Sequence, residues 1–402
     1  MNPPDGRAPR RRVAFVTQRY GVEVNGGAEY LCRMVAERMA RHWDVEVLTT
    51  CAIDYMTWVD YYPAGVETLN GVTVRRFPVA EPRDVEHFNR LSEALRANPR
   101  PSLEDQEQWM RAQGPWSPTL LRYIETDRAQ YDLVIFFGYL YAQTYFGLRL
   151  AGDRAVLVPF AHDEWTIHLP MWDAIFAMPR AIVFSTIEEQ RFLARRFRGA
   201  RLRGPVVGAA VERPREVSPQ RFRREHRIGD SFVLYVGRVD PSKGCGEMFE
   251  HYLHHAAATG DARPLVTIGR AVMPVPSHPQ VLALGFVSEQ VKWDALAACD
   301  LLVMPSPYES LSIVLLEAWS VMKPALVNGR SEVLRGQVCR ANGGLAYSDR
   351  REFSAALATL SNGAAASVLG RQGHDYVRNR YSWKTIEAEY LEVAAAVQGN
   401  RP

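Results

Sequence analysis

The sequence has little cysteine, and no two of its cysteines are spaced to hold a metal or to form a redox pair. The five cysteines stand at positions 32, 51, 245, 299 and 339, without a CxxC motif. This scatter excludes a zinc ribbon and a thioredoxin-like site. It fits buried thiols in a reducing compartment, so we expect a cytoplasmic protein.

Excess charge of one sign and long apolar runs are also scarce. The net charge is +3, which is too small to indicate a nucleic-acid partner. The amino-terminal residues are polar and rich in arginine, without the apolar stretch of a secretory signal, so export is not expected. The longest uncharged stretch, residues 133–148, is shorter than a membrane span and predicts a buried strand followed by a helix.

Two nucleotide-binding fingerprints are missing. Neither glycine-rich loop of the chain spells GxGxxG, and GxxxxGK[ST] does not occur. These absences disfavour a nicotinamide-dependent oxidoreductase and a P-loop nucleotidase. We therefore expect no dinucleotide cofactor.

Length and pattern predict two α/β domains. A chain of 402 residues that is 47% apolar is too long for one ordinary core. Short β-branched and aromatic runs alternate with helical patterns, which predicts two Rossmann-like, doubly wound domains facing across a cleft. The predicted strands lie at 13–18, 45–50, 72–77, 133–138, 155–160 and 181–186 in the first half, and at 232–237, 265–269, 281–286, 301–306 and 324–328 in the second.

Interruptions in the alternation of strand and helix patterns indicate where an insertion and the domain boundary lie. Residues 78–130 lose the strand pattern and read as charged helical segments inserted in the first domain. Glycine and proline cluster at 201–216, so the boundary is placed between residues 205 and 206. Thr186 with Glu189 predicts a capping box, and Ser288 predicts the cap of another helix.

The loops after the strands are where a ligand is expected. In open α/β sheets, ligands bind beyond the carboxyl ends of the strands, near helix amino termini. Gly26 and Gly27 follow the first strand and either admit a ligand to the backbone or form an ordinary turn. Arg238 and Lys243 share a later loop, as a pyrophosphate clamp or as surface charge. His162 follows the strand at 155–160, where a lone histidine is commonly structural.

The stretch PYESLSIVLLEAW, residues 307–319, sets two glutamates eight positions apart. If the whole stretch is helical, this spacing is about 12 Å, close to the separation of sugar and ribose in a nucleotide sugar. Glu309 could then take the sugar and Glu317 the ribose, with the helix-start amides near Leu311 to Ile313 at the diphosphate. Two helical glutamates with this spacing are also commonplace on surfaces.

Taken together, these loops resemble glycosyltransferase family 4, whose members are retaining enzymes of the GT-B architecture. The resemblance covers most of the chain and is carried by NGGAEYL, by HD at 162–163, by GRVDPSKG at 237–244, by GFVSEQVKWDALAACDLLVMPSPYES and by the E-x7-E of Glu309 and Glu317. Members of the family end with a helix that crosses back to the first domain. Residues 380–402 look like that helix, and residues 206–379 like the nucleotide-sugar domain.

The resemblance implies a hexosyltransferase that moves a sugar from a nucleotide diphosphate donor to an acceptor hydroxyl, with retention of configuration. Arg238 and Lys243 would hold the diphosphate and His162 would contact the reacting sugar. Glu309 would position the sugar and Glu317 would bind the ribose. A donor phosphate oxygen would accept the acceptor's proton, so no protein base is required. No DxD is present, so we expect neither metal nor cofactor.

Three features leave the donor and the acceptor open. Ser310, Leu311 and Ser312 stand where many members have glycine or Phe-Gly, so the approach of the backbone to the sugar can differ. Tyr55 and Trp58 lie on a loop that could stack on an acceptor glycan or could be ordinary core. An arginine-rich segment at 191–203 is either a solvated face or a contact with an anionic partner, such as a lipid headgroup at the inner face of a membrane or a phosphate-bearing substrate.

Two functions from different classes remain. The first is a retaining, metal-independent transferase whose acceptor is a glycan, a lipid-linked saccharide or a small glycoconjugate, with polysaccharide biosynthesis as the family's common setting. The second is a non-catalytic protein of the same fold that binds a nucleotide sugar or a glycan. The presence of a pyrophosphate clamp beside an E-x7-E favours the transferase.

Overall fold

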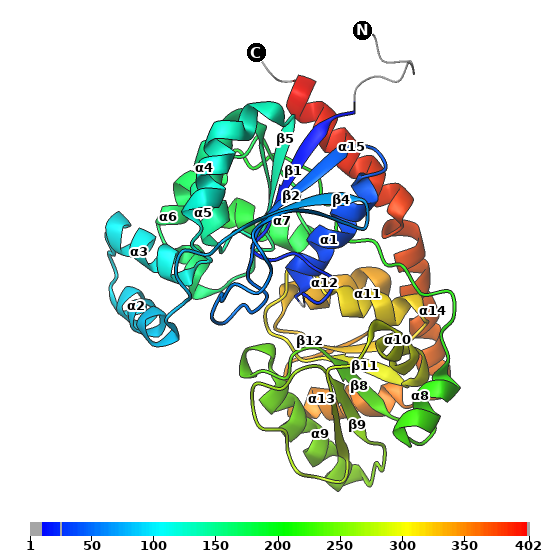
Figure 1. Cartoon of the computed structure of the whole chain (residues 1–402). Coiled ribbons are helices and arrows are strands. Elements are labelled where there is room, and N and C mark those ends of the chain that lie inside the picture. The colour runs from blue at the N-terminus through cyan, green and yellow to red at the C-terminus, as the bar shows by residue number, and fades with distance from the viewer. Residues whose placement is uncertain (1–9, 25, 400–402) are drawn as a thin grey trace, which may run out of the picture. The chain divides into compact units, whose positions relative to one another are not determined.

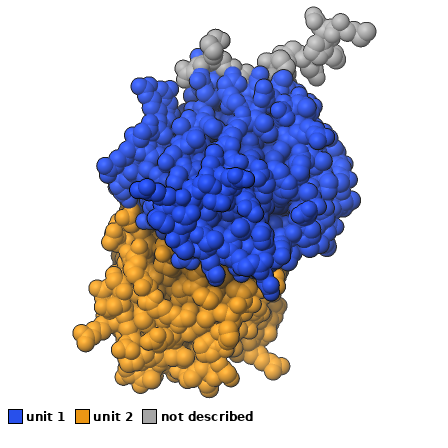
Figure 2. Space-filling model, turned by 90° about the vertical axis from the view of Figure 1, so that its left-hand side faces the viewer, with its two compact units in different colours: residues 1–207, 387–402 blue, residues 208–386 orange. Residues whose placement is uncertain are grey.

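The computed structural model describes residues 10–24 and 26–399. Two compact units are present, one formed by residues 1–207 with 387–402 and the other by residues 208–386 (Figure 2). The sequence places the first boundary between residues 205 and 206, and the structure places it between 207 and 208. The last helix, α15 (Trp383–Gly399), begins in the second unit, and from residue 387 onward it is part of the first.

The first unit is built on a mostly parallel sheet of seven strands. The strand order predicts that the ends of β1, β5 and β6 meet at one edge, because these three strands are parallel neighbours. In spatial order the strands are β3 (Gly65–Leu69), β4 (Val72–Phe77), β2 (Asp44–Thr50), β1 (Arg12–Val16), β5 (Leu133–Phe137), β6 (Ala155–Val158) and β7 (Ala181–Ile182).

Helices cover this sheet (Figure 1). Every residue of β5 and β6 is buried. A strand that is buried on both faces needs apolar residues at every position, which is why β5 reads LVIFF without alternation. The helices are α1 (Gly27–Met39), α2 (Val85–Ala97), α3 (Leu103–Gln113), α4 (Pro118–Asp127), α5 (Ala142–Ala151), α6 (Met171–Ala177) and α7 (Ile187–Arg196), with single 3₁₀ turns at Arg128–Gln130, Gly152–Arg154 and Trp165–His168.

The second unit is built on a parallel sheet of six strands. The neighbours that matter for the site are β8 and β11, which pair directly although 64 residues separate their ends. In spatial order the strands are β10 (Val281–Gly285), β9 (Leu265–Ile268), β8 (Val233–Val236), β11 (Leu301–Met304), β12 (Ala325–Asn328) and β13 (Gly344–Tyr347). The helices are α8 (Pro219–His226), α9 (Cys245–Thr259), α10 (Glu289–Ala298), α11 (Ile313–Ser320), α12 (Glu332–Ala341), α13 (Arg350–Leu360) and α14 (Gly363–Arg380), with the 3₁₀ turn η4 at Pro241–Lys243.

All eleven predicted strands occur, and helices α2, α3 and α4 occupy the predicted insertion. Two strands were not predicted. β3 is an exposed edge strand, joined to β4 through Asn70 and Gly71, which both have positive φ. Asn-Gly between strands is the usual signal of a tight hairpin, so this strand was detectable. β13 has four residues and begins at a glycine, which is too little pattern to identify a strand.

Among the residues that the structure describes, no single helix is long and apolar enough to cross a membrane. Only α13 taken with residues 363–399 meets that test of length and composition, as a pair bent by 94°. The apolar residues Phe353, Leu357 and Leu360 of α13 are buried in the core of the second unit. Their apolarity is therefore explained by packing against the sheet.

Candidate functional site

Two loops meet at the carboxyl edge of the second sheet. Because β8 and β11 are adjacent and parallel, the loops that follow them lie side by side. Gly244 closes the first loop with φ 73°, and a Cβ at this position would clash with the carbonyl oxygen of Pro305 in the second. Glycine is therefore required here by its backbone conformation and by the close approach of the two loops.

The central contact of the site joins Lys243 and Glu309. The Lys243 Nζ lies 2.7 Å from the Glu309 Oε1, across 66 positions of sequence. The Glu309 side chain is 13% exposed and the Lys243 side chain 35%. The structure therefore brings together the predicted cation of the first loop and the predicted carboxylate of the second, at the edge where ligands of such sheets bind.

Arg238 lies on the same loop, which is held by hydrogen bonds. The Arg238 Nε donates to Asp240 Oδ2 at 2.7 Å, and the Tyr235 hydroxyl donates to the Arg238 carbonyl oxygen at 2.7 Å. Asp240 also accepts from the N–H and the hydroxyl of Ser242. Burial alone would raise the pKa of Asp240, but the Ser242 hydrogen bonds and Arg238 lower it below its ordinary value. Asp240 thus stays ionised and orients the arginine.

The helix of the E-x7-E stretch begins later than the sequence prediction assumed. Helix α11 starts at Ile313, and the Ser312 side chain caps it by accepting from the Leu315 N–H at 3.3 Å. Glu309 therefore lies in the loop, and the assumed helical rise of eight residues between the glutamates is wrong. Serine is a preferred N-cap because its side chain satisfies an unpaired N–H of the first turn. Ser310 and Leu311 precede the cap in this loop.

Glu317 lies inside α11 and is buried against α10. Its Oε1 accepts from the Lys292 Nζ at 2.8 Å, and the side chain is 2% exposed. Its Oε2 has no hydrogen-bond partner among the described residues. Burial lowers the pKa of Lys292, but the Glu317 and Glu289 carboxylates outweigh burial and raise it above its ordinary value. Lys292 was not predicted, because nothing in sequence indicates which face of α10 meets α11.

A pocket of about 500 Å³ opens beside these loops. It lies between the loops after β8, β11 and β12, and Tyr308, a neighbour of Glu309 in the chain, is on its wall. Arg330 also lines the pocket and pairs with Glu247. The residues that line it are Pro241, Gly244, Gly246, Glu247, Met273, Pro307, Tyr308 and Arg330.

In the first unit, Gly26 and Gly27 stand at the start of α1. Gly26 is the N-cap, and a Cβ there would clash with the carboxylate of Glu29. A Cβ on Gly27 would meet no atom within 4 Å, so open space lies beside the first residue of the helix. Glu29 is held in turn by Arg19, whose Nε donates to its Oε1 at 3.0 Å. The loop therefore presents helix N–H groups next to a buried ion pair.

His162 follows β6 at the same edge of the first sheet. The residue two positions earlier, Phe160, has φ 53°, a conformation that is uncommon for a bulky residue and clusters at functional sites. The His162 Nδ1 lies 3.5 Å from the Glu164 Oε1, which accepts from the Tyr139 hydroxyl at 2.8 Å. His162 is thus a partly exposed ring that lies beside a carboxylate.

Glu189 fixes the position of the loop that carries His162. One oxygen of its carboxylate accepts from the Ala161 N–H at 2.6 Å, and the other accepts from the Ser185 N–H at 2.6 Å. The Thr186 side chain accepts from the Glu189 N–H at 3.2 Å, so Thr186 is the N-cap of α7, which is the first half of the predicted capping box. Burial raises the pKa of Glu189 to about 8, although these N–H groups oppose the shift.

The two aromatic residues predicted to contact an acceptor differ in their surroundings. Trp58 is 1% exposed, its Nε1 donates to the Gln113 carbonyl oxygen at 2.8 Å, and the Arg83 guanidinium covers its ring. The prediction that Trp58 stacks on a sugar is therefore wrong, and the alternative of core packing is correct for this residue. Tyr55 packs against the small apolar cluster formed by Ala52, Trp58 and Val79, and it is partly exposed.

No metal-binding arrangement is found within residues 10–24 and 26–399. A group of three or more histidine, cysteine, aspartate and glutamate side chains that could hold an ion does not occur there. Four of the five cysteines are buried, and all five are free thiols. Ser288 caps α10 as predicted, by accepting from the Val291 N–H.

One protein-family model matches a large part of the second unit. Residues 230–362 match the family model described as glycosyl transferases group 1, and this range contains the loops of Lys243 and Glu309. None of the curated proteins matches the sequence.

Solved structures match nearly the whole chain. Sucrose-phosphate synthase from Thermosynechococcus elongatus has a TM-score of 0.71 at 16% identity, with 98% of this chain and 100% of that chain covered. HepE from Anabaena, in complex with UDP and glucose, has a TM-score of 0.66 at 15% identity, covering 96% and 100%. The α,α-trehalose 6-phosphate synthase from Burkholderia multivorans has a TM-score of 0.66 at 12% identity, covering 98% and 99%.

These likenesses establish the fold. The chain consists of two α/β units with the GT-B architecture, as the sequence predicted.

Proposed function

We propose that this chain is a retaining glycosyltransferase of family 4 that transfers a hexose from a nucleoside diphosphate donor to an acceptor hydroxyl. The contact between Lys243 and Glu309 carries the proposal. It places a cation suited to phosphate and a carboxylate suited to sugar hydroxyls within hydrogen-bond distance, on two loops at the ligand-binding edge of a parallel sheet.

Arg238 and Lys243 would hold the diphosphate. Negative charge builds up on the leaving nucleoside diphosphate as the sugar departs, and fixed cations stabilise that charge by an amount usually worth several kcal/mol. Lys243 has three N–H donors, so it can contact a phosphate oxygen and keep its bond to Glu309. Arg238 is oriented by Asp240 through Nε, and the planar fork of its guanidinium matches the oxygens of a phosphate.

The two glutamates would bind the other two parts of the donor, the sugar and the ribose. Glu309 lies beside the pocket of about 500 Å³, which is large enough for a hexose. Glu317 would bind the ribose: its buried Oε2 has no partner among the described residues and would gain one from a ribose hydroxyl once the ligand or the side chain moves to bring the two together. Residues Ser310 to Ile313 would contribute loop groups and the first N–H groups of α11.

Retention would follow from attack on the face of the sugar that the leaving group departs from. A donor phosphate oxygen would accept the proton of the acceptor, and His162 would contact the reacting sugar. Gly26 and Gly27 would let the donor or the acceptor approach the start of α1, where a side chain at residue 27 would occupy open space. The acceptor class is a glycan, a lipid-linked saccharide or a small glycoconjugate, and no metal takes part.

A donor panel tests the proposal. HepE was determined with UDP and glucose, so UDP-hexoses are the first donors to try, followed by GDP- and ADP-hexoses. We expect release of nucleoside diphosphate that persists in excess EDTA, and a product with the anomeric configuration of the donor by proton NMR. Binding of nucleotide without release from any donor would favour the non-catalytic binding protein instead, and an inverted product would reject the retaining assignment.

A further inference from the structure

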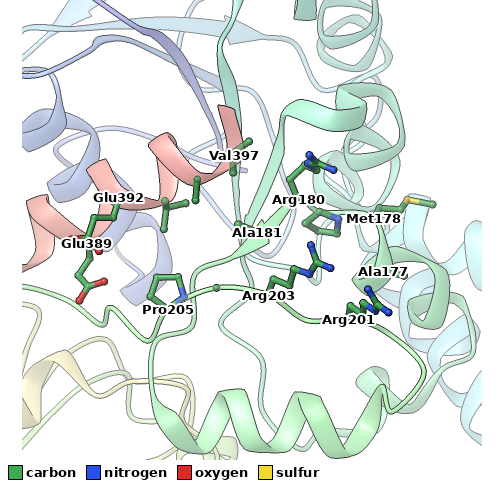
Figure 3. A pocket seen from close by; sticks show the side chains of 14 residues that line it. Ala177, Met178, Arg180, Ala181, Arg201, Arg203, Pro205, Glu389, Glu392 and Val397 are labelled. Carbon is green, nitrogen blue, oxygen red and sulfur yellow. The ribbon is translucent and has the colours of Figure 1, made fainter. Parts of the chain in front are cut away.

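A second pocket lies in the first unit, away from the loops described above. Its volume is about 540 Å³, and it is formed by three segments: the residues that lead from α6 into β7, residues 201–205, and the last turns of α15 (Figure 3). β6 and β7 are parallel, so Arg180, just before β7, lies at the opposite edge of the sheet from His162, which follows β6. The pocket is thus not the edge where Gly26, Gly27 and His162 stand.

One wall of the pocket is basic and its backbone is pinned to the sheet. Arg180, Arg201 and Arg203 line this side (Figure 3). The Arg180 N–H donates to the Ala155 carbonyl oxygen at 2.9 Å, and the Ile182 N–H donates to the Arg203 carbonyl oxygen at 2.7 Å. The backbone positions of the arginines at 180 and 203 are therefore set by the sheet itself.

The facing wall is acidic and belongs to α15. Glu389 and Glu392 are three residues apart, so their side chains lie on one face of the helix (Figure 3). α15 is fastened near both ends to this unit. Glu387 pairs with Arg38, and the Gln398 Nε2 donates to the Asp132 Oδ1 at 3.1 Å.

The two charged walls do not neutralise each other. Among the described residues, the side chains of Arg201 and Arg203 form no hydrogen bond or ion pair, and neither do the side chains of Glu389 and Glu392. Between the walls, Ala181, Pro205, Val393, Ala396 and Val397 supply an apolar surface. Opposite charges that share one pocket without contact are available to a ligand that carries complementary groups at its two ends.

We propose that this pocket binds a small phosphorylated sugar or polyol. Its phosphate would lie against Arg201 and Arg203, because guanidinium forks match phosphate oxygens. Its hydroxyls would donate to Glu389 and Glu392, and the C–H face of its ring would cover Val393. The volume lies within the usual range for small-molecule sites, roughly 300 to 1,000 Å³.

The acidic wall favours a sugar phosphate over other anions, because only a ligand with hydroxyl groups can donate to its carboxylates. Inorganic phosphate is too small to contact the arginines and the carboxylates on the two walls with several hydroxyls at once, and an anionic bilayer would be repelled by both carboxylates. A sugar phosphate satisfies both walls at once. The inference goes beyond the proposed transfer reaction and does not depend on it.

Titration calorimetry with glucose 6-phosphate as the probe tests the inference. We expect saturable binding that is tighter than binding of glucose or of inorganic phosphate. The double variant Arg201→Gln with Arg203→Gln should weaken it by roughly tenfold or more, because charge-assisted bonds are lost. Glu389→Gln with Glu392→Gln should weaken glucose 6-phosphate binding but not phosphate binding.

The matched control is Arg198→Gln, since Arg198 is an exposed arginine of the same segment that does not line the pocket. It should bind the probe within about twofold of the wild type, and all variants should bind UDP as the wild type does. Absence of saturable binding, binding that survives in the arginine double variant, or an equal loss in Arg198→Gln would overturn the proposal. So would binding only to phosphatidylglycerol vesicles, which would assign the arginines to a lipid headgroup. Circular dichroism and single variants at 201 and 203 guard against misfolding.

Discussion

Replacing Lys243 with alanine tests the proposed donor site directly. The substitution removes an ammonium that lies 2.7 Å from Glu309 and would contact the donor diphosphate. A hydrogen bond to a charged group contributes about 1.5 to 3 kcal/mol. Because the Lys243 side chain is 35% exposed, solvent screens it and the lower end of that range applies. About 1.5 kcal/mol corresponds to roughly a tenfold weaker binding of nucleoside diphosphate.

Isothermal titration with UDP measures this effect, and Lys384→Ala is the matched control. Lys384 is an exposed lysine of the second unit, and it forms no ion pair with a described residue. The control should bind UDP as the wild type does. Stability should change little in Lys243→Ala, because a partly exposed ion pair contributes at most about 1 kcal/mol. If Lys243→Ala binds UDP as tightly as the control while it remains folded, the assignment of Lys243 to the diphosphate is refuted.

Four further substitutions probe the carboxylates of Glu309, Glu317 and Glu189. Glu309→Gln should lower kcat by about a hundredfold, with UDP affinity changed by less than about threefold, because it alters contacts with the sugar and not with the nucleotide; equal turnover would remove Glu309 from the site. Lys292→Ala should destabilise the second unit by about 3 kcal/mol in urea denaturation, because it leaves the buried Glu317 carboxylate unpaired, and adding Glu317→Gln should recover part of that loss. Glu189→Gln should remove a pH dependence of the free energy of unfolding. Burial raises the pKa of Glu189 from 4.5 to about 8 in the folded state, so the native state binds the proton more tightly than the unfolded state does. The stability that this contributes is present at low pH and is lost as pH rises through 8. Relative to Glu189→Gln, the wild type should lose on the order of 4 kcal/mol between pH 4.5 and pH 8, and parallel curves for the two proteins would contradict the burial argument.

The fold was accessible from sequence because burial on both faces leaves a simple signal. Strands such as LVIFF at 133–137 are apolar at every position and are followed by helical patterns. The edge strand β3 was not predicted because four of its five residues are exposed and carry no apolar pattern. The Asn70-Gly71 turn, however, indicates a hairpin at this position. Local burial, and not overall topology, decided which strands could be identified.

The candidate site was less accessible, because its contacts join distant segments. The bond between Lys243 and Glu309 depends on β8 and β11 being neighbours in the sheet, which no local pattern specifies. The start of α11 could have been found, because Ser312 stands directly before the apolar run and serine favours the N-cap. Trp58 could not be assigned from its loop, because Gln113 and Arg83, which cover it, come from the region of the inserted helices.

The geometry of the second unit also bears on what donor binding has to rearrange. The two loops approach each other so closely at Gly244 and Pro305 that a Cβ on residue 244 would clash, and this close approach is present without a ligand. Glu309 is already oriented by Lys243 before any sugar is present, and Arg238 is already oriented by Asp240. Groups that are fixed in advance lose little conformational entropy on binding and need little reorganisation as charge develops on the leaving group. In the free protein, the ion pair therefore orients both Lys243 and Glu309. Because the pair uses one N–H of the Lys243 ammonium, two further N–H donors are left for a diphosphate.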